Sequence, residues 1–227
     1  MRLIKTSTAN AATRLTGLVI LGWMLLAASC YKPKKVYRFI PLAMKAYWDF
    51  KPGSYWIYQD SATGALDTVT VTNYNNYLFE GELSWGKTPA HCEFLEVTMY
   101  HSGDQYYRNY WVNTSYGAAH TPEHNAVWWN KYGDTDYITT SKCFMYPLII
   151  GNTTYSGNGF FTNETRVNNV FEQLWGYPAV VEITQNYNMV EGDQHTRTYW
   201  AGHVGVVKYM YVDSGVTKTL IDYHINP

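Results

Sequence analysis

Alternation of apolar and polar residues is the feature that most restricts the fold of this chain. Three stretches show it clearly: residues 66–74, 94–101 and 179–189. In the second, Leu95 and Val97 alternate with the polar Glu96. A period of two residues places alternate side chains on opposite faces of a strand, so each stretch is predicted to be a strand with one buried face. One-faced strands are typical of antiparallel sheets with one side in solvent.

Short turns connect several of these strands. The run Asp60-Ser61-Ala62-Thr63-Gly64 joins residues 54–59 to residues 66–74. Near the end, Asp213-Ser214-Gly215 joins residues 204–212 to residues 216–225. Asp, Ser and Gly are favoured in such turns, so both connections are predicted to be antiparallel hairpins.

The composition favours strands as well. The chain has 22 Tyr and 9 Trp, and only 15% of its residues are charged. Beyond residue 50, Thr, Val, Tyr and Asn are abundant while Leu and Ala are sparse, a pattern that suits strands better than helices. We expect a mainly β fold with an antiparallel, sandwich-like sheet. One short helix is compatible with residues 167–175, where Val170, Phe171 and Leu174 could share a face.

The N-terminus has the layout of a secretion signal. Arg2, Lys5 and Arg14 precede an apolar run of about twelve residues, 15–26, whereas a spanning helix needs about 20. Small residues at 27–29 then precede Cys30, as a signal peptidase requires. Residues 1–29 are therefore predicted to be a signal peptide.

The string before Cys30 resembles the lipobox of bacterial lipoproteins, with Ala27 where Leu is commoner. The resemblance implies that Cys30 becomes the lipidated first residue of the mature protein. The alternative is an ordinary secretory signal, with Cys30 left as a free thiol. Because Tyr31 rather than Asp follows the cysteine, the resemblance favours the outer membrane. The basic stretch at 31–35 favours a domain that faces the periplasm, since lipoproteins that reach the surface of Bacteroidetes-type bacteria usually carry an acidic stretch there.

Basic residues are concentrated just after the predicted signal. Six of the 14 basic residues of the mature chain lie there: Lys32, Lys34, Lys35, Arg38, Lys45 and Lys51. The chain beyond residue 51 has 8 basic and 17 acidic residues, a net charge of −9. We therefore expect a basic tether at 30–47 and a single β-rich domain at 48–227. A basic tether suits anionic lipid head groups, and an acidic domain argues against a nucleic-acid partner.

With Cys30 lipidated, Cys92 and Cys143 remain, an even number in an oxidising compartment. A disulfide between them would close a loop of about fifty residues and contribute roughly 4 kcal/mol on the chain-entropy model. Two separate buried thiols are the alternative that the sequence leaves open.

Three short strings give the mature chain a resemblance to uncharacterised small lipoproteins of the Bacteroidetes type. They are Pro52-Gly53-Ser54-Tyr55-Trp56-Ile57-Tyr58, Tyr146-Pro147-Leu148-Ile149-Ile150-Gly151-Asn152 and Gly202-His203-Val204-Gly205-Val206-Val207-Lys208. The second string usually runs on to a Trp, where this chain has Thr153 and Thr154. The resemblance implies a β-rich fold similar to half-open barrels that cup lipids or other ligands, and it implies no known activity.

The strongest chemical motif is His120-Thr121-Pro122-Glu123-His124, which matches the His-x-x-Glu-His pattern of zinc peptidases. That pattern requires a helix, so that both histidines share one face. Pro122 disrupts a helical turn. We therefore expect a polar loop at 120–124, with no metal, no cofactor and no catalytic residue. The sequence also lacks the Gly-x-Ser-x-Gly nucleophile motif.

Two further patterns concern modification and binding. Asp60-Ser61-Ala62 and Asp67-Thr68-Val69 resemble Asp-Ser/Thr-aliphatic O-glycosylation sites, which makes Ser61 and Thr68 candidates. Four aromatic pairs occur: Tyr106-Tyr107, Trp128-Trp129, Phe160-Phe161 and Tyr199-Trp200. On a strand, one member of each pair should be buried and the other exposed. Exposed aromatics near Asn can stack on sugar rings, although packing of the core explains them as well.

Three functions are compatible with these observations. The first is a non-enzymatic, membrane-anchored lipoprotein that binds an apolar ligand or a partner in the cell envelope. The second is a glycan-binding module of a polysaccharide uptake system, and the third is a metal-dependent hydrolase. An apolar pocket inside the sheet would favour the first, an exposed row of Trp and Tyr the second, and converging His and acidic side chains the third.

Overall fold

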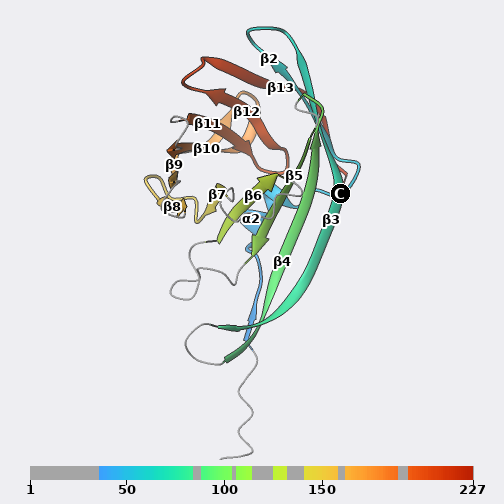
Figure 1. Cartoon of the computed structure of the whole chain (residues 1–227), viewed down its shortest axis with the longest axis vertical. Helices are drawn as coiled ribbons and strands as arrows, with labels where there is room; N and C mark the ends of the chain where they lie inside the picture. The colour runs from blue at the N-terminus through green and yellow to red at the C-terminus, as the bar shows by residue number, and fades with distance from the viewer. Residues whose placement is uncertain are drawn as a thin grey trace, which may run out of the picture.

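The computed structural model describes residues 36–83, 88–103, 106–113, 125–131, 141–157, 162–188 and 194–226 (Figure 1). The strands are β1 (Val36–Arg38), β2 (Tyr55–Asp60), β3 (Leu66–Leu83), β4 (Thr88–His101), β5 (Tyr106–Asn113), β6 (Asn125–Lys131), β7 (Ser141–Tyr146), β8 (Thr153–Gly157), β9 (Thr162–Leu174), β10 (Tyr177–Asn188), β11 (Gln194–Ala201), β12 (Gly205–Tyr211) and β13 (Val216–His224). One helix, α2 (Leu42–Trp48), precedes β2. The predicted mainly β fold is confirmed.

All described strands belong to one sheet, and the main path through it has the order β7-β6-β5-β4-β3-β2-β13-β12-β11-β10-β9-β8. Neighbours on this path are antiparallel, and β1 adds a short parallel pairing to β4. Two meanders, β2–β7 and β8–β13, are therefore joined where the last strand pairs with β2. The predicted hairpins, β2–β3 and β12–β13, are both present.

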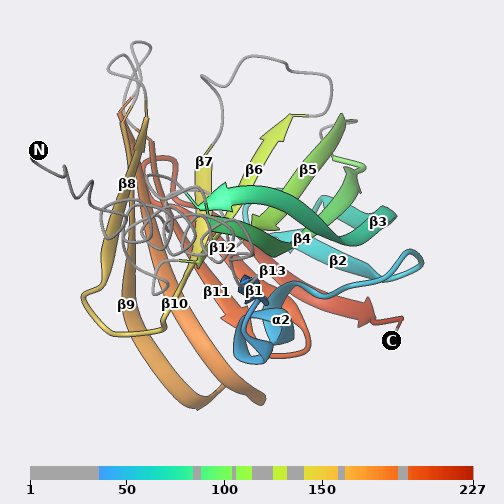
Figure 2. The ribbon, with the colours of Figure 1, turned by 90° about the horizontal axis from the view of Figure 1, so that it is seen from below.

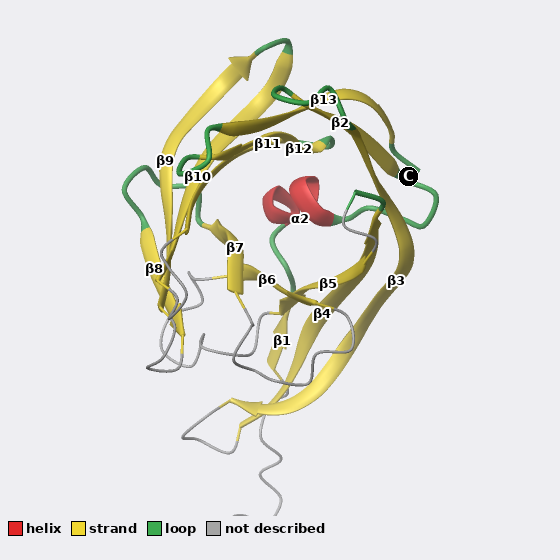
Figure 3. Cartoon of the chain, turned by 45° about the horizontal axis from the view of Figure 1, so that its top comes forward, coloured by secondary structure: helices red, strands yellow, loops and turns green. Residues whose placement is uncertain are grey.

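The sheet curls on itself and surrounds α2, as Figures 2 and 3 show from two directions. Strand β7 comes to lie against β8 and β9. The ladder order nevertheless ends at β7 and β8, so the described strands form a curled sheet that is not closed by pairing. The expected antiparallel sheet is confirmed, in its half-open form.

Alternating residues line the inner face of this curl. Trp56 and Tyr58 of β2 are 3% and 2% exposed, and their strand neighbours are less buried. Val69 pairs with Trp56 across the β2–β3 ladder and is buried with it. The period-two pattern therefore marks the side chains that form the core.

The segment before β2 is part of the core and does not belong to a tether. Ile40, Met44, Tyr47 and Trp48 are all buried, at helical spacing on one side of the chain. Tyr47 packs on Phe144 with ring centroids 5.0 Å apart. The folded domain therefore begins by β1, earlier than the predicted boundary at residue 48. The basic residues led to the prediction of a tether, although large apolar side chains at helical spacing occur in the same segment.

The helix predicted at 167–175 is wrong, because this segment is part of strand β9. The ladder between β9 and β10 shifts register between Glu182 and Ile183 and leaves Asn168 without a direct partner. One extra residue in a strand places the side chains that follow it on the opposite face of the sheet. The three residues of the predicted helical face do not act together, because Val170 is 41% exposed while Phe171 and Leu174 are partly buried against the core.

The expectation for the aromatic pairs also fails at Tyr199 and Trp200, which are 9% and 4% exposed. The register of β11 against β12 shifts between these two residues. Trp200 packs inside against Trp48, while the ring of Trp175 packs against Tyr199. Both members of the pair are buried because both faces of the sheet are covered here. The side chains of the other three pairs, at 106–107, 128–129 and 160–161, are not among those that the structure describes.

Candidate functional site

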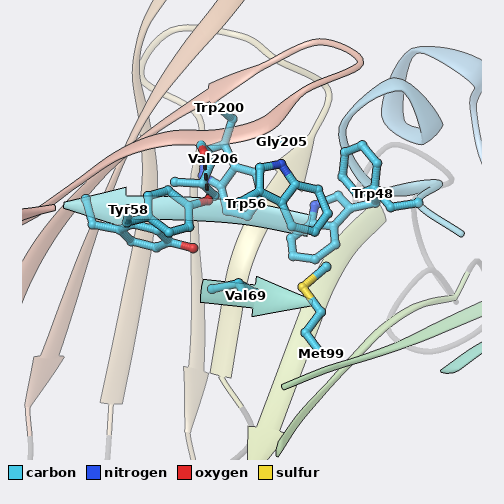
Figure 4. A pocket seen from close by; sticks show the side chains of 10 residues that line it. Trp48, Trp56, Tyr58, Val69, Met99, Trp200, Gly205 and Val206 are labelled. Atoms are coloured by element: carbon cyan, nitrogen blue, oxygen red, sulfur yellow. Dashed lines mark hydrogen bonds between the residues drawn. The ribbon is translucent and has the colours of Figure 1, made fainter. Parts of the chain in front are cut away.

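The interior holds one small aromatic cavity (Figure 4). Its lining includes Trp48, Trp56, Tyr58, Met99 and Trp200. The volume is about 20 Å³, room for roughly one water molecule, whereas ligand pockets usually enclose several hundred cubic ångströms. The interior is therefore packed around these described residues, and a lipid or similar ligand does not fit this cavity.

Two polar side chains beside this cavity have hydrogen-bond acceptors within the protein. The Tyr58 hydroxyl donates to the Val206 carbonyl at 2.8 Å, and the Trp56 indole N–H donates to the Val204 carbonyl. Buried Tyr and Trp commonly need such acceptors. These hydrogen bonds hold the β11–β12 turn region against β2. The Tyr58 hydroxyl and the Trp56 indole N–H therefore both have partners within the protein.

Glu93 fixes α2 to the sheet. Its carboxylate accepts hydrogen bonds from Lys45 Nζ at 2.5 Å, the Ile40 amide at 2.9 Å and Asn76 Nδ2 at 3.1 Å. Burial alone would raise the pKa of Glu93, but the hydrogen bonds and the Lys45 charge outweigh it, so the pKa lies below its ordinary value. This carboxylate joins β3, β4 and the helix, which is a structural role.

A second buried carboxylate, Asp67, lies on β3. One oxygen accepts the Gly103 amide at 2.9 Å and the other accepts Lys218 Nζ at 3.0 Å. Burial raises the pKa of Asp67, while these donors and the nearby His101 lower it, with a net shift below the ordinary value. A Cβ on Gly103 would lie 3.0 Å from the carboxyl carbon, so a side chain there would crowd the ion pair. Both oxygens are engaged, which suits strand anchoring better than proton transfer.

An exposed tryptophan marks the outer side of the sheet. Trp175 is 53% exposed in the two-residue turn between β9 and β10, with φ of 53° at Trp175 and 86° at Gly176. Turns with two left-handed residues favour Asn, Asp or Gly, and a bulky residue is unusual there. Trp175 packs edge-on against Tyr199 at 4.9 Å, and Lys208 Nζ lies 4.8 Å from its ring centroid. The ring is therefore held in place although half of it faces solvent.

The Tyr199 that packs against this ring is also part of a polar cluster around Glu182. The buried carboxylate of Glu182 contacts Asn169 Nδ2 at 2.5 Å, Arg197 Nε at 3.2 Å and the Tyr199 hydroxyl at 3.4 Å. Burial and the Glu182 charge raise the pKa of Tyr199. We call this group the Trp175 platform. Its members are Trp175, Tyr199, Lys208, Glu182, Asn169 and Arg197.

None of the residues considered from the sequence as lipidation, disulfide, O-glycosylation or metal sites is a member of the Trp175 platform. Cys30 and the motif His120 to His124 are outside the described residues. Ser61 is exposed in the β2–β3 turn, whereas Thr68 is half-buried inside β3 with its amide bonded to Ser102 Oγ. Within the part of the chain that the structure describes, no group of three His, Cys, Asp or Glu side chains could hold a metal ion.

The expected disulfide is not formed in the structure. Cys92 is a buried free thiol on β4. Cys143 belongs to β7, and its side chain lies outside the description. Strands β5 and β6 separate the two strands, which corresponds to about 14 Å, whereas disulfides need Cα atoms within about 7 Å. An even cysteine count carries no information about this distance.

Sequence reasoning missed the Trp175 platform and the Glu93 cluster. The Trp175-Gly176 dipeptide was a possible turn signal, but it lay inside the segment interpreted as a helix. Glu93 lies in phase with Leu95 and Val97, so it is a carboxylate on an apolar face. Such a position signals a buried ion pair, although its partner cannot be identified from β4 alone.

Comparison of the chain with models of protein families, with curated proteins and with solved structures gives no significant match. Among the described residues, no helix is long and apolar enough to cross a membrane.

Proposed function

We propose that this protein is a bacterial lipoprotein, anchored through lipid on Cys30, whose domain binds a partner in the cell envelope without enzymatic activity. The observation that carries the proposal is the lipobox-like string that ends at Cys30 after a short apolar run. Two or more acyl chains anchor a protein stably, whereas one chain binds only marginally. Tyr31 and the basic stretch after it favour the outer membrane and a domain that faces the periplasm.

The packed interior favours binding on the outside of the domain. The cavity of about 20 Å³ between α2 and the described strands has no room for a bulky apolar ligand. The buried carboxylates Glu93 and Asp67 are saturated by donors from the protein itself. A binding role on the outer surface therefore agrees better with these contacts than a cup for lipids or a catalytic centre.

The anchor is tested by metabolic labelling. Palmitate should enter the wild-type protein and should not enter the Cys30→Ser variant, because that variant lacks the thiol that accepts the lipid. Cys92→Ser is the matched control and should be labelled like the wild type, since the Cys92 thiol is buried. Equal labelling of the wild type and Cys30→Ser would refute the anchor.

Glycan binding is the second candidate, and the Trp175 platform is the observation that favours it. A half-exposed indole ring, held by Tyr199 and Lys208, offers an apolar face for a sugar ring. The Tyr199 that holds the ring is linked through Glu182 to Asn169 and Arg197, which are polar side chains on the neighbouring strands. Sites that combine a rigid aromatic surface with a few polar groups can fix both the position and the orientation of a ligand.

Trp175→Ala should weaken polysaccharide binding at least tenfold, which corresponds to about 1.4 kcal/mol. The fold should persist because the side chain is in an exposed turn. Calorimetric titration with a panel of soluble polysaccharides measures the effect. Tyr155→Ala removes another exposed aromatic residue, on the edge strand β8, and should leave binding unchanged. Equal weakening by both substitutions, or none by either, would count against the platform.

A further inference from the structure

Apolar side chains are exposed at the end of the molecule where the chain enters the fold. Tyr37 is 53% exposed, Phe39 63%, Leu42 82% and Leu78 46%. Tyr37 and Phe39 stack with ring centroids 6.5 Å apart. We call these four residues the apolar rim.

The topology gathers the apolar rim at one end of the sheet. Strand β1 pairs with residues 90–92 of β4, beyond the segment of β4 that pairs with β5. Leu78 pairs with Glu93 on the other side of β4. Figure 1 shows β1 beside the lower part of the β3–β4 hairpin, whereas the β2–β3 turn lies at the opposite end. Leu66, at that opposite end of β3, is twelve residues or about 40 Å from Leu78 along the strand.

The chain before β1 is too short to hold this end far from a bilayer. Only residues 31–35 separate Cys30 from Val36, because the rest of the predicted tether forms β1, the segment after it and most of α2. Six residue steps reach at most about 22 Å when fully extended. If Cys30 carries lipid, β1 therefore lies within about 22 Å of the membrane.

The basic residues near the apolar rim also favour a position close to the membrane. Lys32, Lys34 and Lys35 precede β1, and Arg38 lies within it. These four basic residues flank the apolar rim in sequence, and they outnumber the exposed Glu80, whose carboxylate lies 3.4 Å from His91 Nδ1 at the same end of the sheet. Basic residues beside exposed apolar ones are the combination that binds the interface of anionic bilayers.

We propose that the apolar rim is a membrane-contact surface that docks the domain on the bilayer with the β1 end down. The proposal rests on the lipid anchor at Cys30. In this orientation the turns at 61–64 and 213–215 point away from the membrane. Lipidation alone would tether the domain, and the apolar rim would fix which side of it faces the periplasm.

Cross-linking of the full lipidated protein in vesicles tests the proposal. The vesicles contain phosphatidylethanolamine, phosphatidylglycerol and a phospholipid with a diazirine close to its head group, and the cross-linked residues are mapped by mass spectrometry. Cross-links should concentrate at 37–42 and around Leu78. The variant Phe39→Asp with Leu42→Asp should lower them at least fivefold while it still floats with the vesicles.

The matched control is Leu66→Asp with Val212→Asp, which changes two similarly exposed apolar residues at the opposite end. It should leave the cross-links unchanged, and melting curves of both variants should match the wild type. Even cross-linking over both ends, or equal loss in both variants, would overturn the docking surface. Lipid cross-links that are absent from 37–42 although the protein floats with the vesicles would also overturn it. Failure of the wild type to float would refute the anchor itself, and with it the docking.

Discussion

Replacing Trp48 with alanine is expected to lower the free energy of unfolding by about 3–5 kcal/mol, the usual range for a large aromatic residue removed from a core. Trp48 is 2% exposed, and its ring lies 4.8 Å from that of Trp200. The smaller side chain would leave a void between the helix and the sheet, beside a cavity that already exists. Urea denaturation at pH 7 measures the change as a lower midpoint with a similar slope.

Leu42→Ala is the control on the same helix. Leu42 is 82% exposed, so its loss should change the free energy of unfolding by less than about 0.5 kcal/mol. The pair of variants tests whether α2 is a part of the core or the end of a tether. Small and equal changes at both positions would mean that the helix does not pack inside the sheet.

The strands were predictable because alternation depends only on neighbouring residues. Val69, Leu95 and Ile183 were all placed in strands with one apolar side, and all three are buried. The helix was not predicted, since the spacing of Ile40, Met44 and Trp48 covers only two turns and lies among basic residues. Its stability comes from burial against strands far along the chain, and such contacts have no local signature.

The order in which the strands pair could not be predicted from the alternation of neighbouring residues either. Strand β13 pairs with β2, so His224 comes to lie opposite Tyr55, although almost the whole domain separates them in sequence. The same holds for the Glu93 cluster, whose donors come from residues 40, 45 and 76. Alternation shows that Glu93 faces inward, but only the fold shows which cation compensates its charge.

The positions of α2 and of the Trp175 platform both indicate that a partner would bind on the outside of the sheet. Helix α2 occupies the inside of the curled sheet, where a ligand of a half-open barrel would otherwise lie. The outer side carries Trp175, half-exposed and held in a left-handed conformation. A bulky residue in such a turn costs free energy, and residues of this kind are enriched at binding sites. The outer surface is therefore where a search for ligands should begin.

Replacing Glu93 with glutamine is expected to lower the free energy of unfolding by about 2 kcal/mol at pH 7, since a buried hydrogen bond to a charged group is lost. Gln keeps the shape but removes the charge that Lys45 compensates at 2.5 Å. Glu172→Gln, at an exposed position on β9, is the matched control and should change the free energy by less than about 0.5 kcal/mol.

The effect of Glu93→Gln should depend on pH in one direction. Because the pKa of Glu93 in the folded state lies below that in the unfolded chain, the ionised carboxylate stabilises the fold above the unfolded pKa of about 4.3. This contribution is lost as the pH falls through the folded pKa. The gap between wild type and variant should therefore be full at pH 7 and should shrink towards pH 3. Asp67 has a lowered pKa too and is present in both proteins, so the variant keeps part of its acid sensitivity. A gap that stays constant from pH 7 to pH 3 would show that the cost of the substitution comes from packing and that the ionised carboxylate contributes nothing.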